Sequence, residues 1–230
     1  MAWEVLKQGT PRIRGVLFDM DGLVLDTEKL YVRFWMEACH FYGFPMTLEQ
    51  SLRMRSVNSK LAQQNLLEFF GPGADYHQIR NKRIELMDRF LAEGGVELKP
   101  GVTELLDYLK EKGIPAAITS SSPLDRIRAH LGTVGLDGRF DRLCSGREVR
   151  QGKPAPDIYL YGAESLGLKA EECLALEDSP TGIEAAWRAG CWAVVVPDQD
   201  EPNEITLSRC FAKADSLLDV IGILENLLRS

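Results

Sequence analysis

Residues 15–27 read GVLFDMDGLVLDT, and this stretch decides how the rest of the chain is organised. Its first four residues are apolar and predict a short buried strand, which ends at two acids, Asp19 and Asp21, followed by Gly22. Residues two apart on extended backbone point the same way, so both carboxylates are expected on one side of the strand end. In open α/β sheets, ligands bind at such carboxyl ends. The fragment alone stays ambiguous, because Asp-x-Asp-Gly also occurs in ordinary turns and calcium loops.

The overall composition excludes several classes of partner. The chain has 230 residues, enough for one sizeable domain or a domain with an insert, and its 45% hydrophobic content is typical of globular proteins. A formal net charge of -7 argues against nucleic acid or an anionic membrane surface as the main partner. A small anionic substrate stays compatible with this charge, because one bound cation can reverse the field in a cleft.

The sequence gives no sign of export or of metal-binding cysteines. No apolar run is long enough for a signal peptide or a transmembrane helix, so a cytoplasmic protein is expected. The five cysteines are widely spread and form no Cys-x-x-Cys pair, which predicts buried, inert thiols and neither a zinc site nor a disulfide framework.

The pattern changes from strand to helix after Thr27. Apolar residues recur every three or four positions between residues 30 and 41, which predicts a helix ending near residues 43–45. Further helical segments follow up to Gly94, and none shows the alternation of a strand. They are expected around residues 47–54, 59–70 and 76–91.

Helices and strands alternate in the remainder of the chain. Strands are predicted at residues 114–119, 142–145, 173–176 and 192–196, and helices at residues 102–111, 124–131, 156–166, 181–189 and 216–228. Such alternation implies crossover connections and a parallel sheet covered on both faces. We therefore predict a doubly wound parallel α/β core made of residues 1–25 and 96–230, with an all-helical domain of residues 26–95 inserted in it.

Three further predicted strands or loops end in polar groups. The second predicted strand runs into Ser120 and Ser121, whose hydroxyls and amides could hold a phosphate oxygen. The alternative is a helix N-cap, since a serine before proline is a common helix start, and both can be true. Lys153 stands alone in the loop GKPAP, where a lysine is usually solvated. A later strand ends in Glu177 and Asp178, and a helix N-cap accounts for Asp178 but not for its neighbour.

Together these groups form one candidate site. Four carboxylates converging in one crevice would repel each other strongly without a divalent cation, and a ligand set of oxygens without histidine or cysteine indicates Mg²⁺. A lysine and a hydroxyl beside Mg²⁺ suit a transferring phosphoryl group, whose negative charge must be neutralised.

Four motifs stand in a fixed order along the chain: DMDG at residues 19–22, TSS at 119–121, GKPAP at 152–156 and EDS at 177–179. With them the chain resembles a haloacid dehalogenase (HAD) superfamily phosphotransferase. More narrowly, it resembles the subfamily of small-molecule phosphatases and β-phosphoglucomutases that carries a helical cap after the first motif. The resemblance covers residues 14 to 215.

The resemblance implies a role for each motif. Asp19 would be the nucleophile that forms an aspartyl-phosphate, and Asp21 the general acid and base, which gives Mg²⁺ its backbone carbonyl. Ser120, with Ser121 beside it, and Lys153 would bind the phosphoryl group. Glu177 and Asp178 would complete the metal site with Asp19. Thr119 is the alternative to Ser120 as the hydroxyl of the second motif.

The chemistry of these residue types agrees with the implied roles. A carboxylate nucleophile divides hydrolysis into two steps. A second acid two residues along the chain can protonate the leaving alkoxide and then deprotonate water.

Several functions remain open on this scaffold. Dehalogenases and phosphonate hydrolases of the family lack the second aspartate, so Asp21 argues against both. A phosphomutase is the alternative to a phosphatase, but the mutases carry a histidine where this chain has Tyr31, and a glycine in the loop that here reads MRSV at residues 54–57. A catalytically silent scaffold would not need every acid. The departures favour a phosphatase.

The expected substrate is a small phosphorylated metabolite, either a sugar phosphate or a nucleotide-like compound. Its selection would come from cap side chains such as Tyr31, Arg55 and Asn58. The identity of the substrate and the oligomeric state stay open.

Overall fold

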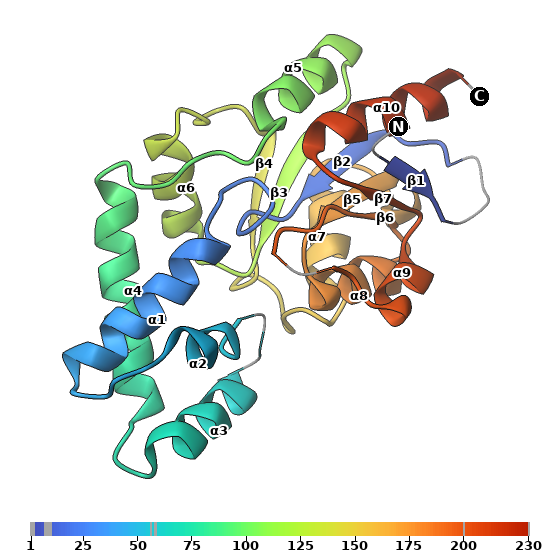
Figure 1. Cartoon of the computed structure of the whole chain (residues 1–230). Helices are drawn as coiled ribbons and strands as arrows, with labels where there is room; N and C mark the ends of the chain where they lie inside the picture. Colours follow the sequence, from blue (N-terminus) through green and yellow to red (C-terminus); the bar gives the residue numbers. More distant parts are fainter. Residues whose placement is uncertain (1–2, 7–10, 56, 58, 200, 230) are drawn as a thin grey trace. The chain divides into compact units, whose positions relative to one another are not determined.

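The computed structural model describes residues 3–6, 11–55, 57, 59–199 and 201–229 (Figure 1). The chain divides into two compact units, Met1–Leu25 with Glu97–Ser230 and, between these segments, Asp26–Val96. That the two units are separate core and cap domains stays a prediction.

A seven-stranded sheet forms the first unit, in the order β1-β7-β6-β5-β2-β3-β4. Its strands are β1 (Trp3–Val5), β2 (Gly15–Phe18), β3 (Ala116–Ser120), β4 (Arg142–Ser145), β5 (Cys173–Glu177), β6 (Trp192–Val195) and β7 (Ala212–Ala214). Strand β2 lies between β5 and β3, pairs in parallel with both, and is buried along its whole length. The apolar stretch that opens the first motif is thus the central strand of the sheet.

The predicted α/β class is confirmed, but the sheet is mixed. β1 pairs antiparallel with β7, whereas the other neighbouring strands pair in parallel. Neither β1 nor β7 is predicted from the sequence, because three residues are too few to show an alternation of polar and apolar side chains. The antiparallel pair lies at the edge of the sheet, a common place for such a strand in an otherwise parallel sheet.

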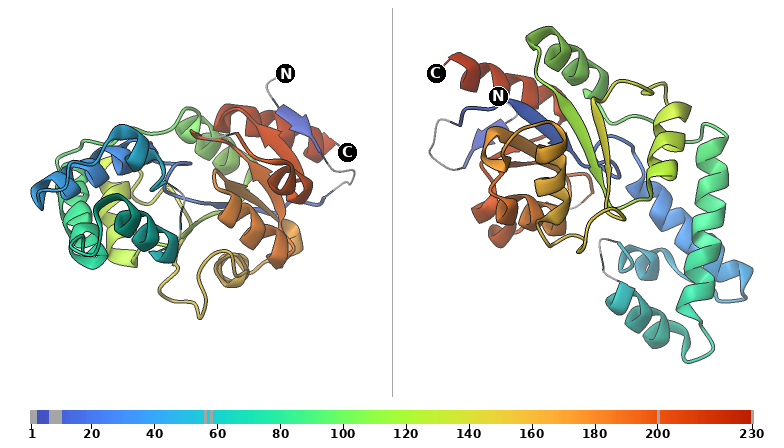
Figure 2. Two further views of the ribbon diagram at one scale, coloured as in Figure 1. Left: turned by 60° about the horizontal axis from the view of Figure 1, so that its bottom comes forward. Right: turned by 180° about the vertical axis from the view of Figure 1, so that it is seen from behind.

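Helices cover both faces of this sheet. They are α5 (Val102–Lys112), α6 (Leu124–Thr133), α7 (Asp157–Ser165), α8 (Pro180–Ala189), α9 (Glu204–Arg209) and α10 (Leu217–Arg229), with a 3₁₀ turn at Ala170–Glu172. Helices α5 and α10 pack together on one face, and α7, α8 and α9 lie on the other (Figures 1 and 2). Beneath α7 and α8, the small side chains of Ala117, Ala175 and Ala193 are buried, so helix and sheet approach closely.

The five cysteines lie in the interior. All five are buried free thiols, which agrees with the inert role expected from their spacing. Burial raises the pKa of Cys39, Cys173 and Cys210 to about 12.

In the described residues of the second unit, the named secondary-structure elements are four helices joined by turns and loops. These are α1 (Glu28–Phe41), α2 (Leu48–Leu52), α3 (Ser59–Phe70) and α4 (Tyr76–Ala92). α1 packs along α4, and its buried Trp35 stacks on Tyr76 with ring centroids 6.3 Å apart. The side chain of Thr47 and that of Gln50 form a capping box at the start of α2. Among the helices of the described residues in either unit, none is both long and apolar enough to cross a membrane.

Gly101 fixes the contact between α5 and α10. It is the N-cap residue of α5 with φ = +89°, and a Cβ atom built on it would lie 2.3 Å from the backbone nitrogen of Leu218. That neighbour is backbone and cannot move aside as a flexible side chain would. Glycine is therefore required here both for its conformation and for space.

We expect Gly101→Ala to lower the free energy of unfolding by about 3 kcal/mol, since left-handed strain and overpacking add together. Gly113→Ala is the matched control: Gly113 ends the same helix with φ = +65°, and nothing lies within 4 Å of its added Cβ. It should cost only about 1–2 kcal/mol. Urea unfolding of both variants measures this difference. Equal losses of unfolding free energy in the two variants would show that α10 can shift away from residue 101 without loss of stability.

Candidate active site

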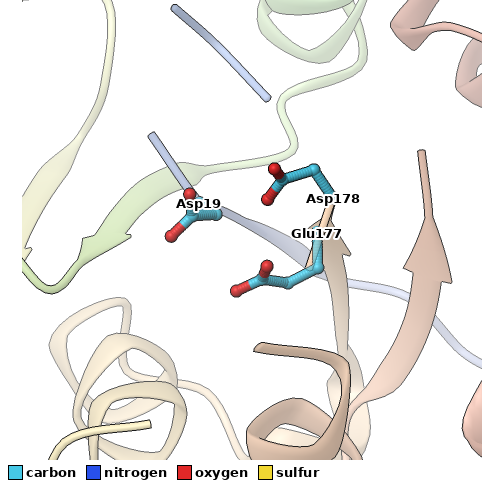
Figure 3. Close-up of side chains that lie close together, drawn as sticks. All are labelled: Asp19, Glu177 and Asp178. Carbon is cyan, nitrogen blue, oxygen red and sulfur yellow. The ribbon is translucent and has the colours of Figure 1, made fainter. Parts of the chain in front are cut away.

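The carboxyl ends of β2 and β5 bring three acids together. Asp19 follows β2 directly, and its backbone N–H donates to the carbonyl of Leu176 on β5 (3.0 Å). Glu177 ends β5, and Asp178 is the next residue. One carboxylate oxygen from each of the three acids lies within 4.8 Å of the others, as the close-up in Figure 3 shows. Parallel pairing of two strands that each end in an acid is the reason for this proximity.

Lys153 lies against this acidic group. Its Nζ donates to Oδ1 of Asp19 (2.5 Å) and to Oε1 of Glu177 (2.6 Å), and only 8% of its side chain is exposed. The sequence left open that this lysine is solvated, and the structure shows that it is not. It is the cation that compensates two buried carboxylates.

The charges of the site shift each other's pKa values. Burial raises the pKa of Asp19 to about 7, although Lys153 opposes the shift, and Glu177 and Asp21 add to it. Burial also opposes the charge of Lys153, but the carboxylates of Asp19 and Glu177 outweigh it and raise the pKa of the ammonium well above 10.5. The lysine therefore stays charged, whereas Asp19 holds a proton more readily than an exposed aspartate does.

The hydroxyls of the second motif have different partners. Thr119 and Ser120 both belong to β3 and are buried. The Thr119 hydroxyl donates to the carbonyl of Phe18 on β2 (3.1 Å). Oγ of Ser120 accepts from the backbone N–H of Ser122 at the strand end (3.1 Å), and Ser121 is exposed. This geometry favours Ser120 over Thr119 as the phosphate-binding hydroxyl, although the role of either stays a prediction.

Asp21 is placed by a tight turn. Gly22, with φ = 87°, donates its N–H to the carbonyl of Leu25 (2.9 Å), and Asp21 and Leu25 form an isolated β-bridge. Asp21 is half-buried. Among the described residues, the acid cluster comprises Asp19, Glu177 and Asp178 without the side chain of Asp21. Its general acid–base role stays a prediction.

Glu177 is held by one residue that the sequence did not indicate. The hydroxyl of Tyr159 on α7 donates to its Oε1, and the Tyr159 side chain is completely buried. A tyrosine among apolar residues of a predicted helix reads as core, so no local signal distinguished it. Burial and the neighbouring Glu177 raise the pKa of this phenol well above 10, so it stays a donor.

Residues at the N-terminus of α8 also contact Glu177. Ser179 caps the helix by accepting from the N–H of Gly182 (3.1 Å), and its hydroxyl donates to Oε2 of Glu177 (3.1 Å). A Cβ atom on Gly182 would lie 1.9 Å from the Glu177 carboxyl group. The carboxyl group of Glu177 is therefore tightly packed and held in one position.

The expected substrate-selecting residues belong to the helical unit. Tyr31 lies on α1, where its ring centre is 4.6 Å from the guanidinium carbon of Arg83 on α4. Arg55 follows α2 and is half-buried, whereas Asn58 lies outside the described residues. A role for these side chains in substrate selection stays a prediction.

Comparison with known proteins identifies one family. The family model of haloacid dehalogenase-like hydrolases matches residues 16–196, which is more than half of the chain. The phosphorylated carbohydrates phosphatase of Thermotoga maritima is 33% identical over 77% of this chain and 82% of its own. Hexitol phosphatase A of Escherichia coli K12 is 33% identical over 85% of this chain and 90% of its own.

A solved structure adds a relative with a different assigned activity. It is a Thermotoga maritima protein assigned provisionally as a β-phosphoglucomutase, with a TM-score of 0.78 and 29% identity. The similarity covers 93% of this chain and 99% of that one. Together with the family model, it confirms the resemblance inferred from the four motifs.

The raised pKa of Asp19 predicts how the stability of the metal-free protein depends on pH. Its folded-state pKa of about 7 lies above the ordinary 3.8, so ionisation costs stability. This loss of stability is absent below about pH 4, grows between about pH 4 and 7, and is complete above about pH 7. Asp19→Asn avoids the loss because asparagine does not ionise.

We therefore expect the unfolding free energy of Asp19→Asn, relative to wild type, to rise from about pH 5 to about pH 8. Urea unfolding in excess chelator measures this difference. Asp137→Asn, which removes an exposed carboxylate, is the control and should show no such trend. A difference that is constant with pH would contradict the raised pKa of Asp19.

Proposed function

The chain belongs to the haloacid dehalogenase-like hydrolases and is an enzyme acting on phosphate monoesters, and we propose that it is a Mg²⁺-dependent phosphatase that works through an aspartyl-phosphate on Asp19. The observation that carries this proposal is the position of Asp19. Its carboxylate lies at the end of the central strand, bonded to Lys153 and gathered with Glu177 and Asp178. The proposed nucleophile Asp19, the ammonium of Lys153 and the carboxylate oxygens proposed as metal ligands therefore lie close together.

The donor set fits Mg²⁺. The acid cluster offers carboxylate oxygens within 4.8 Å of one another and contains neither histidine nor cysteine. Hard oxygen ligands of this kind suit Mg²⁺ better than Zn²⁺ or copper. We assign its binding to the carboxylates of Asp19 and Asp178 and the backbone carbonyl of Asp21, with Glu177 beside them. When bound, the ion would neutralise charge on the phosphoryl oxygens.

The first step transfers the phosphoryl group to the protein. A carboxylate oxygen of Asp19 attacks phosphorus while the bond from phosphorus to the substrate oxygen breaks. Asp21 gives its proton to that oxygen, so the product leaves as an alcohol. Lys153 neutralises the phosphoryl charge, and Ser120, which accepts from Ser122, can donate its own hydroxyl hydrogen to a phosphoryl oxygen.

The second step returns the protein to its starting state. Asp21, now ionised, takes a proton from water as the water oxygen attacks the phosphorus of the aspartyl-phosphate. The bond between phosphorus and Asp19 breaks, inorganic phosphate leaves, and Asp21 is protonated again. One phosphate ester and one water give one alcohol and one phosphate.

A sugar phosphate is the proposed substrate class. The relatives named above are a phosphatase of phosphorylated carbohydrates and a hexitol phosphatase, which favours a sugar or sugar-alcohol phosphate over a nucleotide-like compound. We keep Tyr31, Arg55 and Asn58 as the proposed selecting residues. We also propose that the enzyme acts in the cytoplasm, without a nucleic-acid or membrane partner.

A phosphomutase is the second candidate, because a solved relative carries that assignment. Tyr31, in place of the histidine of the mutases, argues against it. A panel of phosphorylated sugars, assayed with Mg²⁺ for released phosphate and for isomerised sugar phosphate, separates the two functions. Release of phosphate without isomer supports the phosphatase.

The metal requirement is directly testable. We expect excess chelator to abolish phosphate release and added Mg²⁺ to restore it, because uncompensated acids would repel the substrate phosphate. Ca²⁺ should restore little activity, since its larger and more variable ligand shell does not hold the octahedral geometry of Mg²⁺. Full activity in chelator would exclude the proposed metal site.

The two aspartates should give different defects. Asp19→Asn keeps the shape of the side chain but cannot attack phosphorus, so kcat should fall by about 10⁴-fold or more. Asp21→Asn keeps the nucleophile and should lose about 10²- to 10⁴-fold, the usual contribution of a general acid and base. With an aryl phosphate, whose leaving group needs no proton, Asp21→Asn should accumulate phosphoenzyme, detected by mass spectrometry. Residual activity near wild type in both variants would refute the assignments.

A further inference from the structure

Both oxygens of the Glu177 carboxylate are engaged by donors from the protein. Oε1 accepts from Nζ of Lys153 (2.6 Å) and from the hydroxyl of Tyr159. Oε2 accepts from Oγ (3.1 Å) and, more weakly, from the backbone N–H (3.4 Å) of Ser179. A carboxylate has about four lone-pair positions, so these donors occupy its hydrogen-bonding capacity. Glu177 is also completely buried, which makes the loss of any one donor costly.

Tyr159 and Lys153 approach the same oxygen atom. Lys153 lies in the loop before α7, and Tyr159 lies on the first turn of that helix. The lysine Nζ is 5.1 Å from the centre of the tyrosine ring, so the ring face also favours the ammonium position. The phenol therefore contacts both members of the Lys153–Glu177 ion pair.

Lysine needs such support because its side chain is long and its ammonium group has no preferred direction. Here the ammonium is bonded to Asp19 on one side and to Glu177 on the other. The terminal torsion of a glutamate is broad and does not fix its oxygens by itself. If Oε1 of Glu177 moves, the ammonium beside Asp19 moves with it, and misplacement of a catalytic group by about 1 Å can cost about 100-fold in rate.

We propose that Tyr159 is a positioning residue for phosphoryl transfer: its hydroxyl fixes the Glu177 carboxylate, which in turn holds Lys153 against Asp19. This inference rests on the proposed function for its effect on the rate. Its effect on the position of Lys153 is separate and can be measured by phosphate binding.

The competing explanation is that Tyr159 only fills the core beneath the sheet. Tyr159→Phe distinguishes the two, because it keeps the ring and removes only the hydroxyl. Tyr161→Phe is the matched control, since it removes a phenol hydroxyl two residues along the same helix that has no part in the site. Thermal unfolding of each variant checks that the fold is kept.

The decisive experiment is a double-mutant cycle of Tyr159→Phe and Glu177→Met, which removes the oxygen that accepts from Tyr159. It measures kcat and KM on a small aryl phosphate at saturating Mg²⁺, and the Kd of inorganic phosphate by calorimetry. We expect Tyr159→Phe to lower kcat about 10-fold, which is about 1.4 kcal/mol, and to weaken phosphate binding several-fold. Tyr161→Phe should change neither quantity.

In the Glu177→Met background, the effect of Tyr159→Phe on both quantities should vanish, because methionine offers no oxygen to accept the hydroxyl. Should Glu177→Met not fold, Lys153→Met provides the second background, where the same loss of effect is expected. Wild-type values in Tyr159→Phe, or the same fold-loss in every background, would overturn the proposal.

Phosphate binding distinguishes a failure of the proposed function from a failure of the proposed role of Tyr159. A wild-type protein that binds phosphate without hydrolysing esters would refute the proposed function, and the cycle in Kd would still decide the role of Tyr159. A wild-type protein that binds no phosphate would overturn both.

Discussion

The candidate site depends on one buried ion-pair network: the Lys153 ammonium between the carboxylates of Asp19 and Glu177. Isolated charges cannot be moved out of water at this depth, so each member depends on the others. The remaining structure supplies what this network needs. Parallel β2 and β5 place the two acids side by side, the loop before α7 delivers the lysine, and α8 packs a glycine against Glu177. Burial raises the pKa of Asp19 to about 7 even though the Lys153 ammonium beside it opposes the shift.

The sequence predicted much of this arrangement because the relevant signals are local. A short apolar run that stops at an acid marks both a strand and the end at which its acid lies, which is why the sequence predicts that Asp19 and Glu177 are neighbours. The order of four motifs then identified the family, which the family model confirms. The edge strands β1 and β7 were missed, because each has only three residues.

The position of Lys153 and the part of Tyr159 could not be read in the same way. A lone lysine in a loop has no periodicity, and its burial depends on which acids the fold brings to it. Tyr159 has the spacing of an ordinary core residue, and only the three-dimensional contact with Glu177 distinguishes it. The sequence predicts a phosphate-binding hydroxyl in the second motif but does not distinguish Thr119 from Ser120, because β3 includes both. In the structure, the Thr119 hydroxyl donates to the carbonyl of Phe18, which favours Ser120.

The buried cysteines have a practical consequence for studies of motion. With pKa values of about 12, the thiols of Cys39, Cys173 and Cys210 are ionised to only about one part in 10⁵ at neutral pH, and the thiolate is the form that reacts with maleimides. Cys144 and Cys191 are buried too, and burial raises their pKa values as well. A cysteine introduced on the surface of each unit could therefore carry a fluorescent dye without removal of the native thiols. Energy transfer between two such dyes would follow the distance between the units through a catalytic cycle.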